Sequence, residues 1–156
     1  MGKAFYIAVI AVILFSALII TSQRKLSEQE SYYHKILNAA SFSGFSLDCS
    51  ECKETILTDV KGNPYIFYKK MKYGDSFLFF ELRANPDAES TLGIINERIN
   101  ASRDREDFAI LSDNSFRYIE DNEYVFQWAD RNYNFVVRGG KELAEQFLKT
   151  AGIVRS

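Results

Sequence analysis

Apolar and polar positions along the chain follow three successive patterns: an unbroken apolar run, a helical repeat, and an alternation with a period of two. The apolar run, Ala4–Thr21, contains neither a charged residue nor a proline. A helix of this length spans roughly 27 Å, close to the hydrocarbon thickness of a bilayer. Because the run is apolar on every side, it predicts a membrane helix rather than a helix of a globular core.

The flanks of this run suit an uncleaved signal anchor, with residues 1–25 forming the anchor and a short tail. Lys3 supplies a basic start, but the apolar stretch is long for a cleaved signal, and Ile20-Thr21-Ser22 is a weak substitute for an Ala-x-Ala cleavage site. A cleaved signal peptide remains the alternative. The apolar run predicts that the lipid bilayer is one partner of the protein, which it contacts through Ala4–Thr21.

The orientation of the anchor rests on several weak signals. Lys3 and the α-amine on one side nearly balance Arg24 and Lys25 on the other. The short tail favours a cytoplasmic N-terminus, the even number of cysteines suits an oxidising compartment, and Asn100 begins a glycosylation sequon. We therefore expect a single-pass protein whose C-terminal domain lies outside the cytoplasm.

The helical repeat follows at residues 26–43 and predicts a stalk or first helix. Ser27 can cap it, and apolar residues from Tyr33 to Ala40 recur at helical spacing. Residues 44–156 then form the expected globular domain. Three strands are predicted at 55–60, 65–73 and 76–83, a helix from about 86 to 100, four strands at 108–111, 116–119, 124–128 and 133–138, and a closing helix at 141–151.

This grouping of strands into runs predicts an α+β fold, with an antiparallel sheet packed by about three helices, because a parallel α/β fold would alternate strand and helix. The composition supports a packed core: 47% of the 156 residues are hydrophobic and 15% are aromatic. From Leu26 onward, 16 basic residues stand against 21 acidic ones, a charge of about −5. An acidic domain is a poor candidate for nucleic-acid binding, and we interpret Lys69, Lys70 and Lys72 as a solvated sheet face.

Signatures of catalysis and of cofactor binding are missing from the sequence. There is no nucleotide-binding glycine motif and no Gly-x-Ser-x-Gly elbow. The single histidine, His34, lies in the first helix, where an exposed position is ordinary. We expect no cofactor and no metal, and although the sequence does not decide whether the protein is an enzyme, it favours a non-catalytic role.

Cys49 and Cys52 are the only cysteines and form a Cys-x-x-Cys pair. A redox centre would place such a pair at a helix N-terminus, whereas the residues after Cys52 are typical of a strand. A tetrahedral zinc site needs four ligands, which two cysteines and one histidine of a single chain cannot supply; only dimerisation, with two cysteine pairs sharing one ion, would complete it. A local disulfide, or a reduced pair, is the preferred interpretation.

Aromatic residues in the predicted strands are the most unusual feature of the composition. Alternation puts Phe77 and Phe79 on one face of their strand, and it likewise puts Tyr124, Phe126 and Trp128 on one face of theirs. Core packing accounts for such residues in most proteins, and a binding surface built from these five is the alternative.

The order of these segments, an apolar helix, a continuing amphipathic helix and then an antiparallel sheet, resembles the layout of type IV pilins and pseudopilins. That family is processed at a glycine directly before the mature helix, and here Gly2-Lys3 precedes Ala4. The resemblance implies a structural subunit. The preferred hypothesis is an accessory binding subunit of an envelope complex with another membrane or envelope protein as its partner, and a thiol-disulfide redox protein is the other alternative. Homo-oligomerisation is left open by the sequence.

Overall fold

The computed structural model describes residues 28–60, 62 and 64–152. The chain divides into two units, residues 1–34 and 35–156. A helix covers residues 28–42, close to the predicted 26–43. The predicted membrane helix lies outside the described residues, and within them no helix is long and apolar enough to cross a bilayer.

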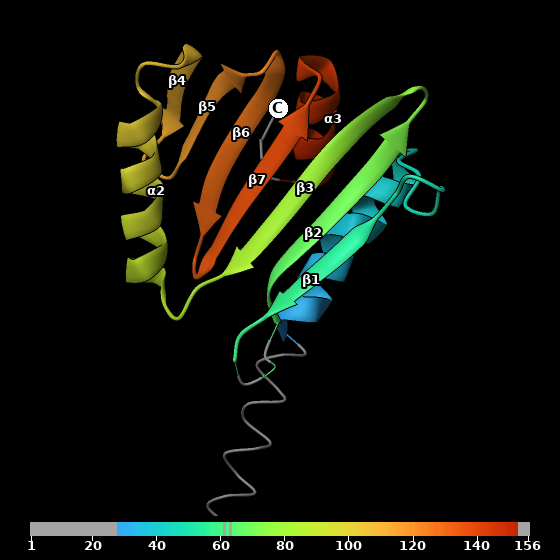
Figure 1. Ribbon diagram of the computed structural model, residues 1–156, viewed down its shortest axis with the longest axis horizontal. Helices are drawn as coiled ribbons and strands as arrows, with labels where there is room; N and C mark the ends of the chain where they lie inside the picture. Colours follow the sequence, from blue (N-terminus) through green and yellow to red (C-terminus); the bar gives the residue numbers. More distant parts are fainter. Residues whose placement is uncertain (1–27, 61, 63, 153–156) are drawn as a thin grey trace, which may run out of the picture. The chain divides into compact units, whose positions relative to one another are not determined.

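The second unit has the predicted order of elements (Figure 1). The first three strands are β1 (Glu54–Thr58), β2 (Pro64–Tyr73) and β3 (Ser76–Ala84), and helix α2 (Ala88–Ser102) follows them. Four more strands come next: β4 (Glu106–Ser112), β5 (Ser115–Glu120), β6 (Glu123–Asp130) and β7 (Tyr133–Gly139). Helix α3 (Lys141–Thr150) is the last element. The α+β class and the antiparallel sheet are therefore confirmed.

All seven strands form one antiparallel sheet in the order β1-β2-β3-β7-β6-β5-β4. The two runs of strands are joined through β3 and β7, which pair from Leu78 opposite Gly139 to Ala84 opposite Tyr133. The last strand of the chain thus lies in the middle of the sheet, and β1 and β4 lie at its two edges (Figure 1).

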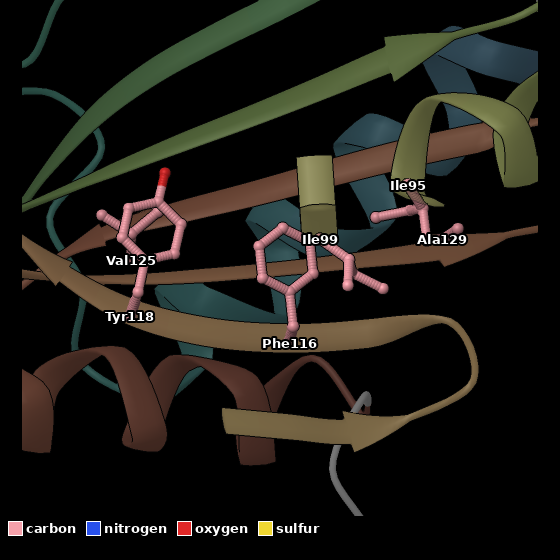
Figure 2. Packing of buried hydrophobic residues seen from close by; sticks show 6 residues of the cluster. All are labelled: Ile95, Ile99, Phe116, Tyr118, Val125 and Ala129. Atoms are coloured by element: carbon pink, nitrogen blue, oxygen red, sulfur yellow. The ribbon is translucent and has the colours of Figure 1, made fainter. Parts of the chain in front are cut away.

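Helix α2 covers one face of the sheet over β5, β6 and β7. Ile95 and Ile99, one turn apart on the helix, pack against side chains of these strands. Figure 2 shows this cluster, whose strand members are Phe116, Tyr118, Val125 and Ala129. The Ile95–Ile99 side of α2 therefore forms the core on this face of the sheet, whereas Leu92 of the same helix is 46% exposed.

Helix α3 lies on the opposite face, where the core is mainly aromatic. Phe147 of this helix meets Phe80 of β3 with ring centroids 5.2 Å apart, and it meets Phe45 at 5.7 Å. Both Phe80 and Phe147 are fully buried. On this same side, residues 35–42 lie behind β1 and β2 in the view of Figure 1, and Ile36, Leu37 and Ala40 are buried.

Candidate binding surface

The α2 side of the sheet is covered over only part of its width. Helix α2 packs on β5, β6 and β7, and apart from the buried Ile66 the side chains of β2 and β3 on this side, from Tyr68 to Arg83, stay half-exposed. Cross-strand partners in an antiparallel sheet share a face, so the register of β2, β3 and β7 identifies these residues. We call them the open face: Tyr68, Lys70, Lys72, Phe77, Phe79, Glu81, Arg83, Val136 and Arg138.

The side chains on the opposite face of the same strands are much more deeply buried. Leu78, Phe80 and Leu82 alternate with the open-face residues of β3, and each is fully buried. The prediction that Phe77 and Phe79 share one face agrees with this alternation. The open face is thus the side of β3 on which large apolar side chains still reach solvent.

Lysine and phenylalanine side chains are stacked at the end of the open face near the β2–β3 turn. The Lys70 ammonium lies 3.9 Å from the ring centroid of Phe77 and 5.6 Å from that of Phe79, and Lys72 lies 5.7 Å from Phe77. Such contacts contribute about 0.5–1 kcal/mol each at exposed sites. Among the described residues neither lysine has a carboxylate within 4.0 Å.

A hollow of about 240 Å³ lies beside this stack and is lined by Tyr68, Phe79, Glu81, Val136 and Arg138. The rings of Tyr68 and Phe79 form its aromatic wall, with centroids 6.1 Å apart. Burial raises the pKa of Tyr68, and the nearby Glu81 carboxylate acts in the same direction. The Tyr68 hydroxyl is therefore neutral over the physiological pH range.

Ion pairs occupy the far side of the hollow. Arg138 bonds to Glu120 and lies 3.6 Å from Glu123, while Arg105 lies 3.0 Å from Glu120. The open face therefore runs from a basic, aromatic end to an end where charges are already paired. Among the described residues of the open face, Lys70 and Lys72 at the first end are the cations without a carboxylate within 4.0 Å.

The five aromatic residues predicted as a binding surface do not lie together. Phe77 and Phe79 belong to the open face, whereas Tyr124, Phe126 and Trp128 point to the α3 side and are 4%, 3% and 5% exposed. Trp128 stacks on Phe135 with centroids 4.5 Å apart. These three side chains are core residues, because α3 and the neighbouring strands cover them.

The lysines of β2 also separate. Lys70 and Lys72 lie on the open face, but Lys69 points to the other side and is only 7% exposed. The register places Lys69 opposite Glu54 of β1. The prediction of one solvated face is therefore wrong for Lys69, because the period of two along a strand places its side chain on the other face from Lys70 and Lys72.

Cys49 and Cys52 form a disulfide bond, one of the two states that the sequence analysis preferred, and their Cα atoms lie 4.8 Å apart. The bond closes a turn at the edge of the sheet, because Ser46 pairs with Lys72 before it and the Lys70 N–H donates to the Lys53 carbonyl after it. Strand β1 begins at Glu54, so the pair precedes a strand and not a helix N-terminus. The helix dipole that activates a Cys-x-x-Cys thiol is therefore not placed at this turn.

The remaining candidates lie apart from the open face. His34 is largely exposed and lies 4.0 Å from Glu30 within residues 28–34. Asn100 lies on the exposed side of α2, and Ser102 of its sequon is buried at the end of that helix. In the part of the chain that the structure describes, no group of three His, Cys, Asp or Glu residues is placed to hold a metal ion.

No family model matches the sequence, and no curated protein or solved structure matches the chain.

Proposed function

We propose that the protein is a membrane-anchored, extracytoplasmic binding domain without catalytic activity, an accessory subunit that holds another membrane or envelope protein through its open face. The anchor and the orientation rest on the apolar run and its flanks in the sequence. The observation that carries the binding role is the uncovered part of the sheet, where Phe77 and Phe79 reach solvent beside Lys70.

The chemistry of the open face favours a partner with both apolar and acidic groups. Exposed aromatic side chains gain free energy when a partner removes them from water. Lys70 and Lys72 have no acidic neighbour within 4.0 Å among the described residues, so a partner carboxylate would find them uncompensated. The surrounding domain is acidic overall, so this cationic end would steer such a partner to one part of the surface.

Site-specific photocrosslinking in membranes of the source cells tests this proposal. A photoreactive side chain at Phe79 should give a discrete crosslinked product with another envelope protein. The same group at Phe42, which is 93% exposed and lies in the first helix, is the matched control and should not give that product. Adding Lys70→Glu and Lys72→Glu to the Phe79 variant should reduce the yield, because the charge that attracts the partner is reversed.

Two outcomes would contradict the proposal. One is the absence of a product at Phe79. The other is an identical set of products at Phe79 and Phe42, because contact through the open face would then not be specific.

The two alternatives predict other results. Pilin-like processing predicts an intact mass lacking Met1-Gly2 or Met1-Gly2-Lys3. A redox role predicts that Cys49 and Cys52 become thiol-reactive in the native protein during turnover, and that replacing both by serine abolishes activity.

A further inference from the structure

The two edges of the sheet differ in a way that bears on assembly. In the described part of the chain β1 has one neighbouring strand, β2, and its other side is open (Figure 1). All five residues of β1 are exposed, and Ile56 and Leu57 are 44% and 45% exposed despite being large and apolar. An exposed edge of this composition is a template for pairing with another strand.

The hydrogen-bonding groups on this edge follow from the β1–β2 register. The Lys70 N–H donates to the Lys53 carbonyl at 2.9 Å, so Lys53 directs its backbone groups toward β2. Backbone direction alternates along an antiparallel strand. Thr55 and Leu57 therefore also face β2, while Ile56 and Thr58 direct their N–H and C=O groups away from it.

The opposite edge, β4, is built in a way that hinders pairing. Its register with β5 shifts twice, between Glu106 and Ala109 and between Ile110 and Ser112. Asp107 has a φ of 50°, which bends the strand locally. Bulges and acidic residues are common devices that protect an edge strand. The single register shift of β1 lies at its end, between Leu57 and Thr58.

We propose that β1 pairs antiparallel with β1 of a second copy of this chain, joining the two sheets into one. Only residues whose backbone groups point away from β2 can exchange hydrogen bonds across the new contact. An outward-facing residue such as Ile56 must therefore lie opposite an outward-facing residue of the second copy. The register with the longest overlap centres on Ile56 opposite Ile56 of the second copy. Thr55 then lies opposite Leu57, and Glu54 opposite Thr58.

In this register the side chains of the two β1 strands are complementary to each other. Ile56 meets Ile56, so an exposed apolar residue is covered by an identical one. Lys53 and Asp59 flank the strand at its two ends and carry opposite charges, so each Lys53 comes to the end of the contact at which Asp59 of the other copy lies. Opposite charges across a strand pair stabilise it and like charges destabilise it. This self-complementarity favours a second copy over an unrelated extended segment, and it concerns a surface separate from the open face.

Paired lysine substitutions in the full chain, purified in detergent, test the contact. Ile56→Lys places two like charges opposite each other at the centre of the interface, so we expect the dissociation constant of the dimer to rise at least tenfold in analytical ultracentrifugation. Ile110→Lys introduces the same charge at a residue of β4 that is 55% exposed, and it should leave the dimer unchanged. Circular dichroism verifies that both variants are folded.

Cysteine crosslinking tests the register independently. Ile56→Cys should form an intermolecular disulfide, because Cα atoms of a hydrogen-bonded pair lie about 5.5 Å apart, within disulfide range. Thr55→Cys alone should not, since its copies would lie roughly 8 Å apart. Mixing Thr55→Cys with Leu57→Cys should restore crosslinking. Ile110→Cys is the control at the other edge.

A monomeric full chain at every concentration would overturn the proposal. So would a dimer that Ile56→Lys leaves intact, or crosslinking of Ile110→Cys in place of Ile56→Cys. None of these results bears on the open face, and a failed photocrosslink at Phe79 would leave the β1 contact standing.

Discussion

The side-chain amide of Asn85 donates a hydrogen bond to Oδ1 of Asn134 at 2.5 Å, although 49 residues separate the two asparagines. Asn85 also donates to Thr91 Oγ1 at 3.1 Å, and all three residues are buried. Asn134 belongs to β7 and Thr91 to the first turns of α2. The pair therefore ties the start of α2 to the central strand on which the helix packs.

Removing one member of this network should destabilise the domain. Asn134→Ala leaves the buried amide of Asn85 short of an acceptor, which costs about 1–3 kcal/mol. Urea unfolding followed by the fluorescence of Trp128, the single tryptophan, measures the change. Asn100→Ala, at an exposed position of α2, is the control and should change the free energy of unfolding by less than about 0.5 kcal/mol. Equal urea midpoints for Asn134→Ala and Asn100→Ala would contradict a stabilising role of the Asn85–Asn134 hydrogen bond.

The aromatic core under α3 should respond much more strongly to truncation than the exposed aromatic residue of the first helix. Phe147→Ala removes a fully buried ring that contacts Phe45 and Phe80, and should cost about 3–5 kcal/mol. Phe42→Ala makes the same chemical change at a side chain that is 93% exposed, and should stay within about 0.5 kcal/mol of the parent. Comparable losses in thermal or urea unfolding would show that α3 is not docked as described.

Alkaline pH should weaken the fold through Tyr124. Burial raises the pKa of Tyr124 above its ordinary value of 10.0, although the hydrogen bond from Arg117 at 2.9 Å opposes the shift. Because the unfolded chain releases this proton first, the stabilisation is complete below about pH 10 and is lost as the pH rises through the higher pKa of the folded state. Burial shifts the pKa of Tyr68 in the same direction.

Urea midpoints measured from pH 8 to pH 11 check this dependence. We expect the free energy of unfolding to fall above about pH 10, with a shallower fall in Tyr124→Phe, which has no proton to release at that position. Tyr124→Phe also loses the Arg117 hydrogen bond, which lowers its stability at every pH. The change in its free energy of unfolding is therefore measured relative to its own value at pH 8. An unchanged slope in this variant would exclude Tyr124 as the group responsible.

The disulfide should contribute little to global stability. Cys49 and Cys52 are three positions apart, and in the chain-entropy model a loop this short contributes about 2 kcal/mol or less. Replacing both cysteines by serine should therefore give a folded protein with an unchanged β1–β2 pairing, as read by hydrogen exchange. A double variant that fails to fold would show that the turn controls how the chain enters the sheet.

Hydrophobic periodicity predicted most of the architecture of residues 44–156 because each pattern depends on local geometry. The alternation along β3 separates Phe77 from Phe80, and the helical spacing of Ile95 and Ile99 produces one stripe of α2. Turn residues such as Gly74 and Asn132 separate strands that lie side by side in the sheet. Sequence pattern was therefore sufficient for the element order and for the antiparallel α+β class.

The candidate surface depended on information that no local pattern contains. Phe79 and Phe126 both lie in predicted strands, each two positions from another aromatic residue, yet the first lies on the open face and the second is buried on the side of α3. The extent of the open face depends on the pairing of β3 with β7, a contact between residues 49 to 61 positions apart. Lys69 likewise became a buried residue only through its neighbours.

The sequence by itself determined the apolar run, the order of helices and strands, and the choice of face for each side chain within its own strand, because these follow from chain geometry over a few residues. Only the tertiary structure decided which strands are neighbours, which part of the sheet α2 leaves uncovered, and which edge strand has the more regular register. Those features arise from contacts between distant segments, so Phe79 and Ile56 could be placed on surfaces only once the sheet was assembled.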